Sequence, residues 1–262
     1  MSGFRYFGMM FFCLLVFMGS TEAQLQLGFY SRSCPNAERI VQDYVNRHIH
    51  NAPSLAAAII RMHFHDCFVR GGPFWRVPTG RRDGTISRSS EALNNIPPPT
   101  SNFTNLQRLF ANQGLDLKDL VLLSGAHTIG VAHCSSFSNR LYNFTGVGDQ
   151  DPALDSEYAA NLKARKCRSL SDNTTIVEMD PGSFRTFDLS YYSLLLKRRG
   201  LFQSDSALTT NSATLSFVNQ LLQGPLQNFF GEFANSMEKM GRVNVKTGTT
   251  GEIRKHCAFV NS

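Results

Sequence analysis

Residues 61–68 read RMHFHDCF and form the last part of a predicted amphipathic helix. Arg61 and His65 are four residues apart, so they project from the same face, with Phe64 beside them. His63 and His65 point to opposite sides of the helix, which is poor geometry for a zinc site. Two interpretations of His65 stay open: a buried histidine bonded to a carbonyl, or a catalytic partner of Arg61.

Residues 124–130 read SGAHTIG and close a second, strongly apolar predicted helix. Small residues flank His127, so a flat cofactor can approach its imidazole closely. A haem iron needs an axial histidine of this kind. The alternative is a helix end with a capping histidine and a stop at Gly130, which requires no ligand.

Helical periodicity dominates the rest of the chain, and Pro, Gly and Asn fill the connections. Asp116 is a good N-cap for the helix that leads to His127. The predicted helices are Asn36 to Ile49, Pro53 to about Phe68, Thr100 to Gln113, Leu117 to Ala126, Leu189 to Arg199, Thr214 to Gln223 and Pro225 to Met240. The expected fold class is therefore mostly α.

The N-terminus carries an apolar run over residues 7–18, preceded by Arg5 and followed by small and polar residues up to Ala23. This pattern predicts a cleavable signal peptide over residues 1–23. The run is shorter than the roughly 20 residues of a membrane-spanning helix, so no membrane anchor is expected. The secreted part, residues 24–262, is long enough for one large domain or two small ones.

The chain is basic, with 26 Lys and Arg against 20 Asp and Glu and a formal charge of +6. A basic surface fits acidic surroundings such as cell-wall polysaccharide. Nucleic acid is not expected as a partner, because the sequence has no Lys/Arg block and no interleaved aromatic and basic residues. Three sequons, at Asn102, Asn143 and Asn173, are expected to be exposed glycosylation sites on a secretory route.

The cysteine count is unusual for a secreted protein. Removal of Cys13 with the signal peptide leaves Cys34, Cys67, Cys134, Cys167 and Cys257. An odd number leaves at least one thiol unpaired or paired between molecules. Because secreted proteins are expected to carry an even set of disulfides, something in this cysteine complement is missing or unusual.

The motifs together resemble those of the plant secretory (class III) haem peroxidases over residues 24–262. The matching segments are QLQLGFYSRSCPNAERIV, AAAIIRMHFHDCFVRG, GPFWRVPTGRRDG, LVLLSGAHTIGVAHC, DPGSFRTFDLSYY, GLFQSD and GEIRKHC. The resemblance implies the haem peroxidase fold, in which two helical lobes sandwich haem b. It also implies a monomeric enzyme of the cell wall, apoplast or vacuole that reduces hydrogen peroxide while oxidising small phenols.

The resemblance assigns roles to individual residues. His65 resembles the distal base that takes a proton from hydrogen peroxide and returns it to the leaving oxygen. Arg61 resembles the distal cation that stabilises the developing negative charge, and Phe64 a wall of the haem pocket. His127 resembles the axial haem ligand, and Asp205 the carboxylate that accepts its second N–H bond.

Further matches concern substrate, calcium and one disulfide. Pro97 matches the position that contacts phenolic substrates, and Cys134 and Cys167 match a disulfide pair. The proximal calcium ligands of the family match Thr128, Asp180, Ser183 and Asp188. The distal calcium site is represented only by Asp66, Val69 and Gly71.

The chain departs from the family pattern between Gly71 and Gly72. Roughly 60 residues are absent there, several helices at the mean length of about 11 to 12 residues. The resemblance places three cysteines in this stretch, as partners of Cys34, Cys67 and Cys257. It also places there the remaining distal calcium ligands and an Asn that orients the distal histidine. One bound calcium is therefore expected instead of two.

Three hypotheses about function follow from the match and the gap. The first is an active secreted haem peroxidase. The second is a catalytically impaired protein that binds haem or the cell wall. The third is a non-functional product of alternative splicing or of an incorrect gene prediction.

Overall fold

The structure is a computed structural model that describes residues 25–52, 55–57, 76–256 and 258–261. The chain divides into two compact units. The first comprises Met1–Pro35, Pro78–Ser87 and Val245–Ser262, and the second Asn36–Val77 and Arg88–Asn244. The candidate site residues that the structure describes belong to the second unit.

The first unit is held together by short backbone bridges between segments distant in sequence. Gln26 pairs with Thr79, and Asp83 with Glu252, both antiparallel. The described part of this unit contains one 3-10 turn, η1 (Phe29–Ser31). Gly80 has φ +102°, and a Cβ there would lie 2.6 Å from the Phe29 ring, so the close approach requires glycine.

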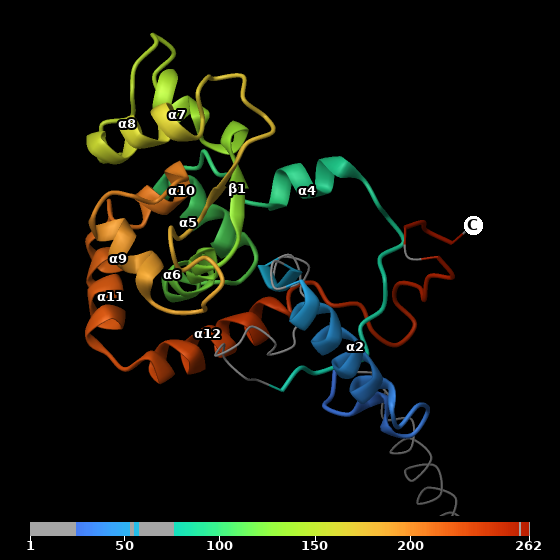
Figure 1. Cartoon of the computed structure of the whole chain (residues 1–262). Coiled ribbons are helices and arrows are strands. Elements are labelled where there is room, and N and C mark those ends of the chain that lie inside the picture. The colour runs from blue at the N-terminus through green and yellow to red at the C-terminus, as the bar shows by residue number, and fades with distance from the viewer. Residues whose placement is uncertain (1–24, 53–54, 58–75, 257, 262) are drawn as a thin grey trace, which may run out of the picture. The chain divides into compact units, whose positions relative to one another are not determined.

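The second unit is mostly helical, as the periodicity predicts (Figure 1). Its described α-helices are α2 (Ala37–Asn51), α4 (Ser89–Asn95), α5 (Phe103–Asn112), α6 (Leu117–Ser124), α7 (Ser138–Tyr142), α8 (Ser156–Arg165), α9 (Ser190–Leu196), α10 (Gln203–Ala207), α11 (Ser212–Gln223) and α12 (Leu226–Met240). Two 3-10 turns, η2 (Gly125–Thr128) and η3 (Cys134–Ser136), connect them to one small sheet. Its strands β1 (Val131–His133) and β2 (Ile176–Glu178) pair antiparallel, with Ala132 opposite Val177.

The larger apolar core surrounds α6, against which α5, α11 and α12 pack (Figure 1). Leu120, Val121 and Leu122 of α6 are almost completely buried. On α12, Phe229 and Phe233 face the same core at helical spacing. Since burying one such side chain stabilises by about 1.5 to 3 kcal/mol, α6 is firmly fixed in the unit. The residues that follow α6 therefore start from a fixed position.

A second core joins β1, β2, α7 and α8, and includes the buried residues Cys134, Phe137, Leu162 and Val177. Leu201, in the turn that leads into α10, also belongs to this core. The core therefore lies beside that turn.

The sequence predicts most of the long helices to within a few residues. The helix expected from Pro53 to Phe68 falls almost entirely outside the described residues. The helix expected over Leu117 to Ala126 ends as an α-helix at Ser124 and tightens into η2, which carries His127. The sequence does not predict helices α4, α7, α8 and α10, because their apolar residues are too few to set a period.

Candidate functional site

His127 lies on η2, directly after the buried helix α6. Asp116 begins α6 with a reciprocal capping box, in which its carboxylate accepts the Asp119 N–H at 2.9 Å. At the other end Gly125 packs tightly, because a Cβ there would lie 2.4 Å from the Tyr192 hydroxyl oxygen. The helix and the tight glycine contact together fix the backbone that carries His127.

The Asp205 carboxylate on α10 holds the His127 ring. The two atoms His127 Nδ1 and Asp205 Oδ1 are 2.7 Å apart. Asp205 is only 1% exposed, and it also accepts the Tyr191 hydroxyl at 2.9 Å and the Phe202 N–H at 2.9 Å. Every bond of Asp205 therefore comes from a donor, as an ionised carboxylate requires.

The electrostatics of the pair keep Asp205 ionised. Burial acts to raise the pKa of Asp205, but the charge and hydrogen bond of His127 outweigh it, helped by Phe202 and Tyr191. The net result is a pKa of Asp205 below its ordinary value. Burial, followed by the negative charge of Asp205, raises the pKa of Tyr191 well above its ordinary value. Tyr191 therefore remains a donor to the carboxylate.

The pair determines which nitrogen of His127 is available. Because a carboxylate only accepts hydrogen bonds, Nδ1 carries a proton, and in the neutral form of the ring Nε2 keeps its lone pair. Within the described residues Nε2 has no hydrogen-bond partner, and the side chain is 36% exposed. The rings of Phe202 and Tyr191 stand nearly perpendicular to the imidazole, at 82° and 84°. An oriented imidazole with an unused nitrogen fits an axial ligand of haem iron.

A cluster of oxygen donors lies next to His127 in sequence. The Thr128 hydroxyl is 3.1 Å from Asp188 and 3.4 Å from Asp180, and the Ser183 hydroxyl is 2.9 Å from Asp188. The Ser190 hydroxyl bonds to both carboxylates. All four residues that the resemblance assigns to proximal calcium thus lie close together, and Ser190 joins them.

The cluster carries two carboxylates without a compensating cation. In the described part of the chain neither Asp180 nor Asp188 forms an ion pair with Lys, Arg or His. Burial, and to a lesser degree the charges of Asp188 and Glu178, raise the pKa of Asp180. The described residues contain no group of three or more His, Cys, Asp or Glu suited to a metal. Hydroxyl oxygens complete this set instead, and hard oxygen donors with two negative charges fit calcium.

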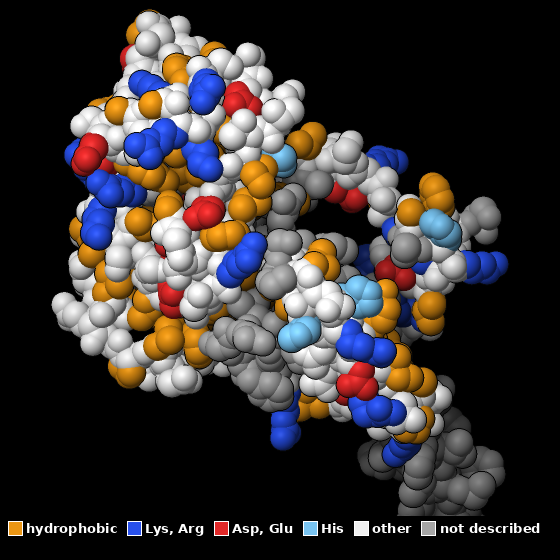
Figure 2. All heavy atoms as spheres, viewed as in Figure 1, with side chains coloured by type: hydrophobic (Ala, Val, Ile, Leu, Met, Phe, Trp, Pro, Cys, Tyr) orange, Lys and Arg blue, Asp and Glu red, His pale blue; other side chains and the backbone are white. Residues whose placement is uncertain are grey.

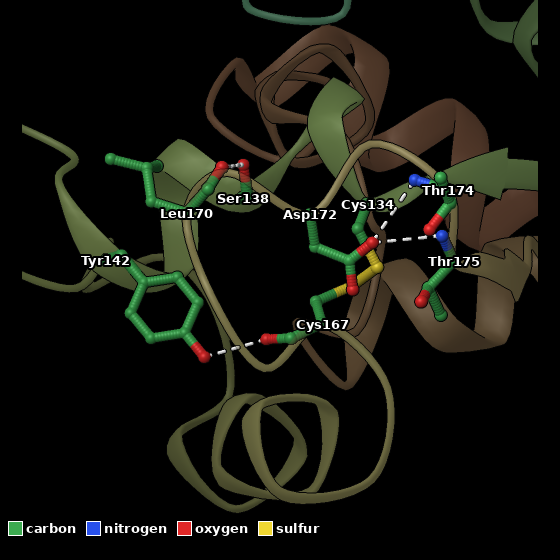
Figure 3. Close-up of a disulfide and its surroundings, with 8 residues drawn as sticks. All are labelled: Cys134, Ser138, Tyr142, Cys167, Leu170, Asp172, Thr174 and Thr175. Carbon is green, nitrogen blue, oxygen red and sulfur yellow. Dashed lines mark hydrogen bonds between the residues drawn. A yellow bond between two sulfur atoms is a disulfide. The ribbon is translucent and has the colours of Figure 1, made fainter.

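The disulfide expected from the resemblance joins Cys134 and Cys167 (Figure 3). Around it the Tyr142 hydroxyl donates to the Cys167 carbonyl at 2.7 Å. The Ser138 hydroxyl donates to the Leu170 carbonyl at 3.0 Å, so the segment after the disulfide is tied to α7. The disulfide therefore fastens the loop between α8 and β2 to the end of β1.

The other predicted residues are placed as follows. Pro97 is half-buried after α4, next to the strongly exposed Ile96, and Cys34 is an exposed free thiol. Asn102 and Asn173 are exposed, and Asn143 is half-buried. The distal residues Arg61, Phe64, His65, Asp66, Val69 and Gly71 lie outside the described residues, as do Cys67 and Cys257.

The sequence does not single out three residues that complete the site. Tyr191 and Phe202 contact the His127–Asp205 pair, and Ser190 bridges the two carboxylates. Tyr191 and Ser190 lie in the segment DLSYY, which marks the family without revealing their separate roles. Their importance comes from tertiary contacts.

A family model described as Peroxidase matches residues 69–224. Peroxidase 3 of Arabidopsis thaliana is 60% identical over 314 residues, covering 96% of this chain and 96% of the relative. The chain belongs to the class III peroxidase family. Two further peroxidases agree: Peroxidase 39 of Arabidopsis thaliana is 56% identical over 97% of this chain and 99% of its own length, and Peroxidase 1 of Oryza sativa subsp. japonica is 44% identical over 92% and 94%.

The family explains the mostly helical architecture, which is that of a haem peroxidase, and it is a family of enzymes. None of the described helices is long and apolar enough to cross a membrane.

Proposed function

We propose that this chain is a secreted haem peroxidase that reduces hydrogen peroxide to water with single electrons from phenolic donors. The His127–Asp205 pair carries the proposal, because its buried carboxylate orients the imidazole and leaves Nε2 for a ligand. Haem b held by His127 would supply an iron centre that takes up two oxidising equivalents from peroxide and passes them to donors one at a time.

Asp205 has two tasks in this proposal. It keeps the proton on Nδ1, so that Nε2 stays free for iron, and its negative charge makes the imidazole a stronger electron donor. Both tasks need an ionised carboxylate, which agrees with the lowered pKa of Asp205. Tyr191 shares the oxygen that accepts the His127 proton and so limits how far that proton is drawn toward Asp205.

The peroxide side of the reaction is assigned by the resemblance to residues outside the described part. His65 would take a proton from one oxygen of hydrogen peroxide and deliver it to the other, which leaves as water. The fixed charge of Arg61 would stabilise the negative charge that develops as the O–O bond breaks. Phe64 would form a wall of the pocket.

The phenolic donor is assigned to the surface around Pro97. Leu93 and Ile96, on and just after α4, are 80% and 63% exposed, so apolar surface is available there for an aromatic ring. Burial of such a ring would be favourable, whereas an inorganic donor would gain nothing from it.

Calcium is proposed at the cluster of Thr128, Asp180, Ser183, Asp188 and Ser190. Its charge would offset the two carboxylates and tie η2 to α9. Because Thr128 directly follows His127, this site would stiffen the backbone of the axial ligand.

Secretion, glycosylation and wall binding also belong to the proposal. Asn102 offers its side-chain oxygen to cap α5, accepting the Asn105 N–H at 2.9 Å, while the residue remains exposed for a glycan. Figure 2 shows Lys and Arg side chains gathered over the region of α7 and α8. Arg165, Lys166 and Arg168, at the end of α8 and beyond, are exposed and could meet acidic polysaccharide.

The alternative to an active enzyme rests on the proposed gap between Gly71 and Gly72. In this alternative, the chain is a product of splicing or of gene prediction and has impaired or no activity. Two observations support a gap. The alignment with Peroxidase 3 of Arabidopsis thaliana extends over 314 residues, more than the 262 of this chain, and the family match begins at Val69. Loss of roughly 60 residues would remove helices at about 11 to 12 residues each and expose their former neighbours.

Reconstitution of the expressed chain with haem and calcium tests these possibilities. An active peroxidase gives a Soret band and oxidises a phenol with peroxide faster than free haemin does. His127→Ala should abolish both signals, whereas His133→Ala, at an exposed histidine of β1, should leave both unchanged.

The other outcomes assign the chain to the alternatives. A Soret band without turnover above free haemin indicates an impaired haem-binding protein. No Soret band, together with a denatured circular dichroism spectrum, indicates the non-functional product. Sequencing the transcript across Gly71 and Gly72 then establishes whether the gap is in the messenger RNA.

A further inference from the structure

Among the described residues, Arg140 has the largest fully buried side chain outside the candidate site, with 0% exposure on the short helix α7. A buried guanidinium stays charged and is costly unless all its donors are satisfied. The proposed reaction gives it no task. Its hydrogen bonds show which groups the positive charge of Arg140 stabilises.

The five hydrogen bonds of Arg140 lead to one acidic partner, one turn and helix α10. Nε donates to Asp151 at 2.7 Å, and Asp151 is itself 1% exposed. Nη1 donates to the carbonyl oxygens of Gly200, Leu201 and Phe202 at 2.7, 2.8 and 2.9 Å. Nη2 donates to the Ser206 hydroxyl at 2.6 Å.

Three successive carbonyls on one side of a turn repel one another unless a positive charge faces them. Nη1 has two protons for three oxygens, so at least one proton is shared. The guanidinium therefore determines the shape of the turn Gly200–Phe202, and a single uncharged amide could not replace it.

This turn leads directly into α10 and touches Asp205 twice. The Phe202 N–H donates to Asp205 Oδ2 at 2.9 Å. Gly200 passes so close that a Cβ there would lie 2.8 Å from the Asp205 Cβ. The Phe202 ring also stands edge-on to His127, with centroids 5.3 Å apart.

We propose that Arg140 is a positioning residue for the His127–Asp205 pair. It acts through the carbonyls of the turn and through Ser206, and Asp151 balances its charge. The proposal rests on the proposed haem site, because it assigns Arg140 a share in setting how strongly His127 donates electrons to iron. A core ion pair with no functional role is the competing explanation, and it predicts an effect on stability alone.

Arg140→Lys is the main test, since lysine keeps the charge beside Asp151 but cannot reach three carbonyls and Ser206 with a planar fork. In the haem-loaded chain we expect a higher ferric/ferrous midpoint potential, in the same direction as Asp205→Asn and smaller. The double variant should shift no further than Asp205→Asn alone, because both changes act on one hydrogen bond. Arg165→Lys, at an exposed arginine of α8, is the control and should leave the potential unchanged.

An unchanged potential in a less stable Arg140→Lys variant would overturn the proposal, as would additive shifts in the double variant. If Arg140→Lys does not fold, Ser206→Ala takes its place in the same cycle. It keeps the ion pair with Asp151 and removes only the bond from the guanidinium to α10.

A second readout needs no haem, so failure of the proposed function can be told apart. Amide hydrogen exchange of the haem-free chain should speed up selectively in the segment Gly200–Ala207 of Arg140→Lys, with α12 unchanged. Uniform acceleration throughout the unit, or none, contradicts a positioning role. If the parent chain gives no Soret band, the haem proposal fails and this measurement still decides the role of Arg140.

Discussion

Nδ1 of His127 donates to Oδ1 of Asp205 across 2.7 Å, although 78 positions separate the two residues in the sequence. Asp205 is held from three sides, by His127, Tyr191 and the Phe202 N–H. A carboxylate with this many fixed donors has little freedom to move. The pair is therefore prepared for a ligand before one binds.

Asp205→Asn tests the charge of this pair. Asparagine can still accept from Nδ1, but it carries no negative charge, so the imidazole donates less to iron. We expect haem binding to persist and peroxide-dependent phenol oxidation to fall on the order of 10- to 100-fold. Steady-state kinetics at saturating peroxide, together with the Soret spectrum, measure the two effects separately.

Asp43→Asn is the matched control, because Asp43 is a half-exposed carboxylate on α2 that only pairs with Arg39. It should change neither turnover nor spectrum. Equal losses in the two variants would mean that the effect of Asp205→Asn is not specific to the pair.

The two residues of the His127–Asp205 pair differ in how well they can be predicted from the sequence. His127 stands out locally, because small residues surround it at the end of an apolar helix. Asp205 is identified only through resemblance, since no local pattern links it to a residue 78 positions away. Arg140 escapes prediction because its role depends on the shape that a distant turn adopts after folding.

Calcium should stabilise the chain through the two carboxylates near Thr128. A ligand at 100 times its Kd stabilises by about 2.7 kcal/mol. For a chain of this size that raises Tm by about 5 to 10 °C. A chelator should reverse the rise, and Asp188→Asn should reduce it. Thermal unfolding followed by circular dichroism, with and without calcium, makes the comparison.

Asp172→Asn serves as the control for calcium, because Asp172 accepts only from Thr174 and Thr175 in a turn outside the cluster. Its response to calcium should equal that of the parent. If Asp188→Asn responds like the parent as well, calcium binds somewhere else.

Reduction of the Cys134–Cys167 disulfide should destabilise the second unit. The bond closes a loop with a sequence separation of 33 residues, and removing a native disulfide typically costs about 2 to 5 kcal/mol. Urea denaturation of Cys134→Ser/Cys167→Ser should show this loss. Cys34→Ser, at the exposed free thiol, should unfold at the parent's midpoint. A shared midpoint for all three proteins would show that the disulfide contributes no stability.

The strength of the local apolar periodicity explains which helices the sequence predicts. In α12 the aromatic and Met residues repeat over four turns, and the predicted and observed ends agree to within one residue. In α8 only Ala159 and Leu162 are buried, so its period is too weak to recognise. Helix α10 has five residues, too few to show a period, and follows the turn whose Leu201 carbonyl accepts from Arg140.

Gly125→Ala should destabilise the protein although alanine is the better helix former. The new Cβ would lie 2.4 Å from the Tyr192 hydroxyl oxygen and 2.9 Å from Phe229, both in the core. Overpacking of this kind costs about 1 to 3 kcal/mol, more than the roughly 0.5 to 1 kcal/mol that alanine gains. Gly231→Ala on α12 meets nothing within 4 Å and should stabilise instead. Chemical denaturation of both variants should give shifts of opposite sign, and equal signs would refute the packing argument.

Asp116 links the stability of α6 to pH. The backbone N–H of Asp119, and to a lesser extent the ammonium of Lys239, lower the pKa of Asp116 below its ordinary value of 3.8. A carboxylate with a depressed folded pKa contributes stability that is fully present above its unfolded pKa and is lost as pH falls through the folded value. Asp116→Ala should therefore cost about 1 kcal/mol at neutral pH, the usual effect of removing an N-cap.

Asp116→Asn separates the cap from the charge, because asparagine caps a helix about as well as aspartate but cannot ionise. At neutral pH it should lose only the attraction to Lys239 and to the helix N-terminus, so its deficit is smaller than that of Asp116→Ala. Its deficit should vanish as the pH falls through the folded pKa of Asp116, which lies below 3.8, because the parent then also becomes neutral at this position. Urea denaturation of the three proteins between neutral and acid pH measures these differences. A deficit of Asp116→Asn that stays constant down to the lowest pH would mean that the charge of Asp116 does not stabilise α6, the helix that leads to His127.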